Sequence, residues 1–303
     1  MTQVVVSLST IPPRFPFIGQ TLHSLLAQSF RPDRIEVWIP RSYRRFPEHS
    51  FCLPDVPDGV TIEVIDEDLG PATKILPCVR KYRGTNTRIV YVDDDRLYWN
   101  RFLETRLEAA AKRPDMCIAA FGCDVSFFLH GDNGVDRIKV DEAYKGGVTG
   151  SHFGLPRTKP RRGGLKNLPS NVPYWIAREI AFARQKGLQF MLWPPDCGYA
   201  DIAEGFSGVL VKPDMFDDES FDIPPVLWAV DDVWLSGCLA RKDIPIWVEK
   251  IVVKGGKKNN ESDGAGITAL FDAVIDGHDR RQANKAAIRY FQDNHGIWLT
   301  DGS

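Results

Sequence analysis

Three consecutive aspartates stand directly at the end of an apolar run. Residues 89–92 read Ile-Val-Tyr-Val, and Asp93, Asp94 and Asp95 follow without a gap. A strand buried on both faces is continuously apolar, and ligands of open α/β sheets collect at the carboxyl ends of the strands. Three carboxylates there repel one another unless a cation shares their charge, as Mg²⁺ or Mn²⁺ carrying substrate phosphates would. The run predicts a phosphate-bound metal site; a turn or helix cap would need only one aspartate.

A second acidic pair, Asp231 and Asp232, opens an apolar-periodic segment in which Leu235, Cys238 and Leu239 share a face. Acids at a helix N-terminus complement the dipole and cap free N–H groups, and the pair alone favours this interpretation. A carboxylate beside a second negative group also binds protons more tightly, as a general base requires. Both interpretations stay open.

Two cations stand at positions where a sheet of this kind binds ligands. Lys74 follows the segment from Asp66 to Pro71 on a first helical turn, where it could contact a phosphate oxygen or simply be solvated. Arg14 follows a diproline turn after the first strand, and it is either a ligand contact or a surface arginine.

The remaining motifs are weaker. His278 could be a metal ligand or a loop histidine, and His295, His152 and His130 are weaker alternatives. There is no His-Glu-x-x-His motif, Walker loop or Gly-x-Gly-x-x-Gly in the sequence. The basic loop 157–166 is either solvated or a contact for an anionic acceptor or membrane headgroups.

Composition is that of a soluble globular protein. The 303 residues are 43% hydrophobic and 26% charged, and the net charge of −2 gives no general attraction to nucleic acid. The six cysteines form no Cys-x-x-Cys pair, which favours free thiols in a reducing compartment. With neither a signal peptide nor a membrane-spanning run, the sequence predicts a cytoplasmic protein.

Strand and helix signals alternate through the first half of the chain. We expect strands over 4–9, 34–39, 60–65, 88–92 and 116–121, and helices over 18–26, 73–82 and 102–112. The second half predicts a loop over 146–164, helices over 174–186, 232–241 and 282–294, strands over 208–211 and 246–253, and a flexible segment over 254–266. This order indicates an α/β fold with a central, mostly parallel sheet and helices on both faces.

Taken in order, these parts resemble a GT-A-fold glycosyltransferase. The segment from Ser9 to Arg14 is similar to the first nucleotide-contacting loop, Asp93-Asp94-Asp95 to the Asp-x-Asp motif, and Val230-Asp231-Asp232 to the x-Glu-Asp motif of inverting members. The resemblance covers roughly residues 3–280. It implies one GT-A-type, Rossmann-like domain over 1–303, with a nucleotide-sugar half (1–125) and an acceptor half (126–303).

The resemblance also implies roles for individual residues. Asp232 would deprotonate the acceptor hydroxyl and Asp231 would orient the acceptor. Asp95 and His278 would hold Mn²⁺ or Mg²⁺. The donor-binding residues would be Thr10, Arg14, Asp66, Lys74, Asp93 and Asp94. The expected reaction is inverting transfer from a nucleoside-diphosphate sugar, with UDP favoured, to a glycan or lipid-linked glycan in surface polysaccharide synthesis. No nucleic acid partner is expected, and the enzyme could work at the inner face of the membrane.

Asp231 departs from the family pattern, because a glutamate is usual at its position. The shorter side chain leaves open which of the two acids is the base. One alternative function is a sugar-nucleotide nucleotidyltransferase, but residues 10–16 contain no glycine to grip a triphosphate. The other is a carbohydrate-binding protein without activity, which the intact acids at both motifs disfavour.

Overall fold

An eight-stranded sheet forms the centre of the computed structural model, which describes residues 2–123, 125–129, 198–249, 260–268, 270, 274–275 and 277–299. In spatial order its strands are β3 (Val60–Ile65), β2 (Arg34–Pro40), β1 (Gln3–Ser9), β4 (Thr87–Tyr91), β10 (Val209–Val211), β6 (Cys117–Ala119), β11 (Ile246–Val248) and β8 (Gly198–Ala200). The first four pair in parallel, as do β6 and β11, whereas β10 and β8 run against their neighbours. The sheet is therefore mostly parallel, as the sequence predicts.

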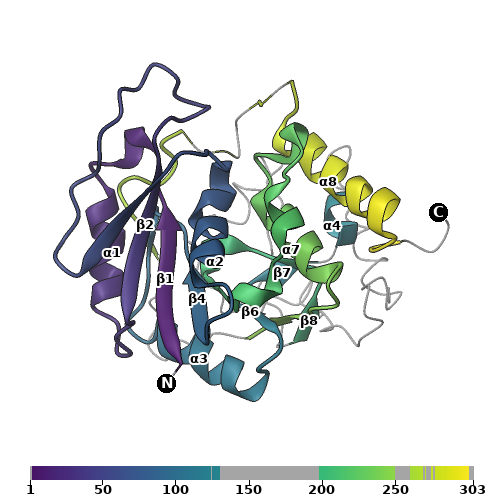
Figure 1. Ribbon diagram of the computed structural model, residues 1–303, viewed down its shortest axis with the longest axis horizontal. Helices are drawn as coiled ribbons and strands as arrows, with labels where there is room; N and C mark the ends of the chain where they lie inside the picture. Colours follow the sequence, from purple (N-terminus) through teal and green to yellow (C-terminus); the bar gives the residue numbers. More distant parts are fainter. Residues whose placement is uncertain are drawn as a thin grey trace, which may run out of the picture.

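Helices cover both faces of this sheet, because successive residues of its buried strands point to opposite sides. Val6 of β1 faces a core that includes α1 (Ile18–Leu26) and α3 (Phe102–Lys112). Val5 faces the other core, with α2 (Leu76–Tyr82), α7 (Asp231–Ala240) and α8 (Arg280–His295). Figure 1 shows α7 and α8 side by side, away from α1. The predicted α/β class is confirmed.

Strand β10 decides what lies at the carboxyl end of β4. Because the two strands are antiparallel and Val209 pairs with Tyr91, the segment that leads into β10 lies where β4 ends. That segment holds β9 (Ile202–Ala203) and a single 3-10 turn, η4 (Gly205–Ser207). Residues more than a hundred positions beyond β4 are thereby brought beside its three terminal aspartates.

The helix predicted over 73–82 is wrong at its start. A 3-10 turn, η2 (Gly70–Lys74), comes first, and α2 begins afresh at Leu76. Pro77 explains the break, because a proline has no N–H to donate and is tolerated only in the first turn of a helix. By contrast, the strand over 60–65 and the helix over 102–112 have their predicted bounds.

The sequence predicts a flexible segment over 254–266, but residues 260–268 are held in place by hydrogen bonds to the first half of the chain. They begin with β12 (Asn260–Glu261), which pairs with β5 (Arg96–Leu97), and continue as turns tied to the first half of the chain. Another short ribbon joins β7 (Gly122–Cys123) to β9, and α4 (Val125–Leu129) follows it. We call residues 260–268 the strap.

Several predictions lie outside the described residues. These are the loop over 146–164 with the basic run 157–166, the helix over 174–186, the last part (250–253) of the strand predicted over 246–253, the first part (254–259) of the predicted flexible segment, and His130 and His152. None of the helices in the described part of the chain is both long and apolar enough to span a bilayer.

Candidate active site

Asp94 fastens the loop after β1 to the end of β4. One of its carboxylate oxygens accepts a hydrogen bond from the Thr10 hydroxyl, and the other accepts one from Arg14 Nη1 at 2.7 Å. Its backbone carbonyl accepts a third from Thr21 Oγ1, at 2.7 Å. Burial raises the pKa of Asp94 even though Arg14 and Thr10 oppose the shift. Both oxygens of this predicted donor-binding residue are thus used by the protein itself.

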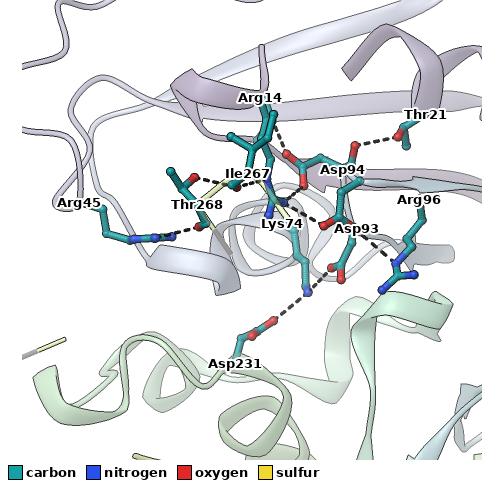
Figure 2. Close-up of polar contacts among 12 residues, drawn as sticks. Arg14, Thr21, Arg45, Lys74, Asp93, Asp94, Arg96, Asp231, Ile267 and Thr268 are labelled. Atoms are coloured by element: carbon teal, nitrogen blue, oxygen red, sulfur yellow. Dashed lines mark hydrogen bonds and ion pairs between the residues drawn. The ribbon is translucent and has the colours of Figure 1, made fainter. Parts of the chain in front are cut away.

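Asp95 lies between Arg14 and the strap. Arg14 Nη1 is 3.2 Å from one carboxylate oxygen, and Arg96 Nε is 3.6 Å from the other. The strap is tied to this region by two hydrogen bonds. Arg14 Nε donates to the Ile267 carbonyl at 3.0 Å (Figure 2). Ser262 N donates to the Asp95 carbonyl at 2.9 Å. Burial, followed by repulsion from Asp93 and Asp94, raises the pKa of Asp95 to about 6.

Lys74 joins the two acidic motifs. Its ammonium lies 2.6 Å from an Asp93 oxygen and 2.8 Å from an Asp231 oxygen (Figure 2). The lysine reaches this place because η2 packs under the end of β1, where Ser7 Oγ donates to the Lys74 carbonyl at 2.6 Å. Only 8% of its side chain is exposed. Burial alone would lower the pKa of Lys74, but Asp231, Asp93 and Asp232 raise it well above its usual value.

Asp93 has a different balance from its two neighbours. Burial would raise its pKa, but the ion pair with Lys74 and the charges of Arg96 and Arg14 together outweigh that effect, so the pKa of Asp93 is lowered. Its side chain is 27% exposed and that of Asp95 is 18% exposed, whereas Asp94 is 8% exposed. Of the three, Asp93 and Asp95 therefore have the surface to contact a ligand.

Asp232 has the weakest cationic partner of the five aspartates. One oxygen accepts a hydrogen bond from Gly205 N at 2.9 Å, and the other lies 3.7 Å from Arg280 Nη2. Burial and the adjacent charge of Asp231 raise the pKa of Asp232 to about 7. A carboxylate with that pKa can accept a proton near neutral pH, as a general base must.

These side chains share one cavity of about 930 Å³. Towards the loop after β1 it is lined by Thr10, Arg14, Tyr43, Arg45, Phe46 and Asp68. Towards η4 and α8 it is lined by Phe128, Glu204, Phe206, Arg280, Arg281 and Asn284. The aspartates and Lys74 lie between the two groups, as their contacts require. Typical ligand pockets measure roughly 300–1,000 Å³, so this cavity is at the upper end of the range.

Two predicted site residues do not line the cavity. Asp66 is 92% exposed and pairs with Arg41 at 2.8 Å, while Asp68, two positions later, does line it. The Asp68 carboxylate accepts hydrogen bonds from Arg44 N and Gly70 N. His278 is exposed on the turn before α8, where its backbone pairs with Ile275, and among the described residues it is absent from the lining.

Glu204 and Arg280 also line the cavity, although no sequence motif predicts either of them as a site residue. Burial and the charge of Asp232 raise the pKa of Glu204 to about 7. The signal for Glu204 was only its place after the two-residue strand β9. Arg280 follows the Gly-His-Asp turn directly, and it enters the cavity because Asp279 caps α8 through a hydrogen bond from Gln282 N at 2.7 Å.

The acids fit a hard divalent ion only if a substrate completes its coordination. In the described part of the chain, no three histidine, cysteine or acidic side chains cluster closely enough to hold a metal by themselves. Mg²⁺ usually needs only one or two carboxylates together with substrate phosphates. Asp95 and Asp93 are exposed to the cavity and can provide these.

No family model matches the sequence, and no curated protein does. Solved structures of S. aureus TarS resemble the fold distantly. The structure of TarS residues 1–349 in complex with UDP has a TM-score of 0.39 and 13% identity, and the match covers 85% of this chain and 59% of that one. The crystal structure of TarS has a TM-score of 0.37 and 11% identity, and the match covers 83% of this chain and 37% of that one. A second structure of TarS 1–349 has a TM-score of 0.38 and 12% identity, with 82% of this chain and 60% of that one covered. This chain thus spans less than two thirds of the length of each of these structures.

Proposed function

We propose that this chain is a metal-dependent, inverting glycosyltransferase that uses a nucleoside-diphosphate sugar, with UDP-sugars the first to test. The acceptor is a glycan or lipid-linked glycan of a surface polysaccharide. One observation carries the proposal: the exposed acids at the end of β4 and a carboxylate suited to accept a proton share one cavity, joined by Lys74. Transfer of a sugar requires both functions within reach of a single substrate pair.

The donor would lie across the carboxyl ends of β1 and β4. Asp93 contacts a sugar or ribose hydroxyl, and Arg14 and Arg96 offer positive charge beside Asp95 for the diphosphate. Mn²⁺ or Mg²⁺ held at Asp95 would neutralise the leaving diphosphate. Thr10 and Asp94 position Arg14, and Asp68 replaces the exposed Asp66 as a donor-side residue.

The acceptor would enter from the side of η4 and α8. Asp232 takes the proton from the acceptor hydroxyl. The oxygen of that hydroxyl then forms the new bond to the anomeric carbon of the donor sugar. The bond from this carbon to the diphosphate oxygen breaks, and the nucleoside diphosphate leaves with the electron pair. Glu204 and Arg280 flank Asp232 and would contact the acceptor.

A thermal-shift screen of nucleoside-diphosphate sugars, each with and without Mn²⁺, tests the proposal. One donor should raise the melting temperature only when the metal is present, because the ligand stabilises the folded state by mass action. If no nucleotide sugar shifts the melting temperature under either condition, the proposal fails.

The two alternatives predict different products. A nucleotidyltransferase would release pyrophosphate from a nucleoside triphosphate, but the loop after β1 forms a 3-10 turn at Pro12–Arg14, whose prolines offer no N–H to phosphates. A binding protein without activity would show the thermal shift without any release of nucleoside diphosphate.

A further inference from the structure

In the described part of the chain two lysines each bridge a pair of carboxylates, and one of the two, Lys74, lines the cavity. Lys81 of α2 lies 2.7 Å from Glu36 and 2.6 Å from Glu63, and a third of its side chain is exposed. Lys74 is nearly buried, and its two partners, Asp93 and Asp231, belong to different motifs of the site. The sequence predicts that Lys74 binds phosphate, but in the structure its ammonium bridges two carboxylates of the protein itself.

The surroundings of Lys74 are shaped to hold the ammonium in this place. Gly205 lies against it, and a Cβ at that position would be 2.7 Å from Lys74 Nζ and 3.0 Å from the nearer Asp232 oxygen. Gly205 N also donates to that Asp232 oxygen. A glycine thus allows the ammonium and the Asp232 carboxylate to lie against the same backbone.

We propose that Lys74 is a positioning residue whose ammonium clamps Asp231 to Asp93 and so leaves Asp232 as the carboxylate of the pair that takes the acceptor's proton. That the proton comes from an acceptor rests on the proposed function, whereas the clamp formed by Lys74 does not. Asp93 and Asp231 both line the cavity, and Lys74 contacts one carboxylate oxygen of each. The clamp therefore also fixes the separation between the donor-side acids and the base.

The charges that face Asp232 make this role measurable. Its negative neighbours are Asp231, Asp93 and Glu204, its cations are Lys74 and Arg280, and the Tyr91 hydroxyl is a further titratable group. Lys74 opposes the effect of Asp231 more strongly than Arg280 does. Removing the ammonium therefore leaves Arg280 as the remaining cation beside Asp232 and its negative neighbours.

The test is a titration of ¹³C-labelled aspartate carboxyls by NMR, with the Asp232 signal identified by its loss in Asp232→Asn. In Lys74→Met the Asp232 midpoint should move up from about 7 by about one pH unit or more, since a cation near the carboxylate has gone. In the matched control Lys81→Met, which breaks the other lysine bridge, it should stay near 7. An unmoved midpoint in Lys74→Met overturns the proposal.

Asp231→Asn keeps the inference testable if Lys74→Met does not fold. This variant keeps the lysine and removes the negative neighbour, so the Asp232 midpoint should fall by about one pH unit. A midpoint that stays or rises would overturn the clamp. Neither titration needs donor, acceptor or turnover, so a failed transferase assay and a failed clamp are separate results.

Discussion

The two acidic motifs of the cavity differ in how closely cations approach their carboxylates. At the end of β4 each carboxylate has a cation within 3.2 Å, through Lys74 for Asp93 and through Arg14 for Asp94 and Asp95. At the start of α7, Asp231 forms an ion pair with Lys74 at 2.8 Å, whereas the ion pair of Asp232 is the longer one to Arg280, at 3.7 Å. The aspartates at the end of β4 are thus closely paired with cations, whereas Asp232 is able to accept a proton.

The difference follows from the elements that supply the cations. The loop after β1 and the turn η2 both end beside β4, so their basic residues reach its aspartates. Asp232 instead faces the backbone of Gly205 and the first residue of α8. We therefore expect substitutions in the first motif to change binding and substitutions at Asp232 to change the chemical step.

The largest expected effect separates Asp232 from Asp231. Asp232→Asn should lower nucleoside diphosphate release by about 10²–10⁴-fold, the usual contribution of a general base, while the donor-induced thermal shift is kept. Asp231→Asn should keep more activity than Asp232→Asn. If Asp232→Asn were active and Asp231→Asn inactive, the base assignment would have to be exchanged.

Asp95→Ala should abolish the Mn²⁺-dependent part of the thermal shift given by the donor, because the carboxylate proposed to hold the ion is lost. Asp66→Ala is the matched control, since that aspartate is exposed outside the cavity lining and its loss should change nothing. A full shift in Asp95→Ala would remove the metal assignment.

Gly205→Ala should reduce turnover by about tenfold with little loss of stability, because the new methyl group displaces the flexible end of Lys74 rather than backbone. Gly19→Ala serves as the control, since a Cβ there meets no atom within 4 Å. Steady-state kinetics and thermal melts of both variants measure the effect. Unchanged turnover in Gly205→Ala would argue that the ammonium's position is unimportant.

The smallest effect concerns stability. The folded-state pKa of Asp232 is about 7 against an ordinary 3.8, so the folded protein binds its proton more tightly than the unfolded chain. The resulting stability is fully present below about pH 4 and is lost as the pH rises through 7. Asp232→Asn should therefore be more stable than the natural protein at pH 8, by on the order of 1–3 kcal/mol, and the gain should shrink at pH 5. Chemical denaturation at both pH values measures it; a gain that is larger at pH 5 would contradict the shifted pKa.

The parts of the fold that repeat a simple pattern could be predicted from the sequence. Val60–Ile65 and Phe102–Lys112 depend on local periodicity, and the apolar run before Asp93 is typical of a strand buried on both faces, which the structure confirms. The insertion of β10 between β4 and β6 could not be predicted, because a strand of three residues shows no period and its neighbours are chosen by tertiary packing.

The same limit applies to the site. The acids and Lys74 were found because their types and positions point to the ends of strands. The contact of Lys74 with both Asp93 and Asp231 could not be predicted, because it depends on where β10 and α7 pack. Glu204 follows a strand of two residues and Arg280 follows a turn, and neither gives a sequence signal for a functional residue. The tertiary fold brings both into the cavity.

The most direct test of the proposed function is the coupled appearance of two products. With the nucleotide sugar that gives the largest thermal shift and a mixture of glycan acceptors, mass spectrometry should detect nucleoside diphosphate and an acceptor heavier by one sugar residue in equal amounts. Both should be absent in Asp232→Asn. Release of nucleoside diphosphate without a heavier acceptor, or equal product from Asp232→Asn, would contradict the assignment of this cavity to base-assisted sugar transfer.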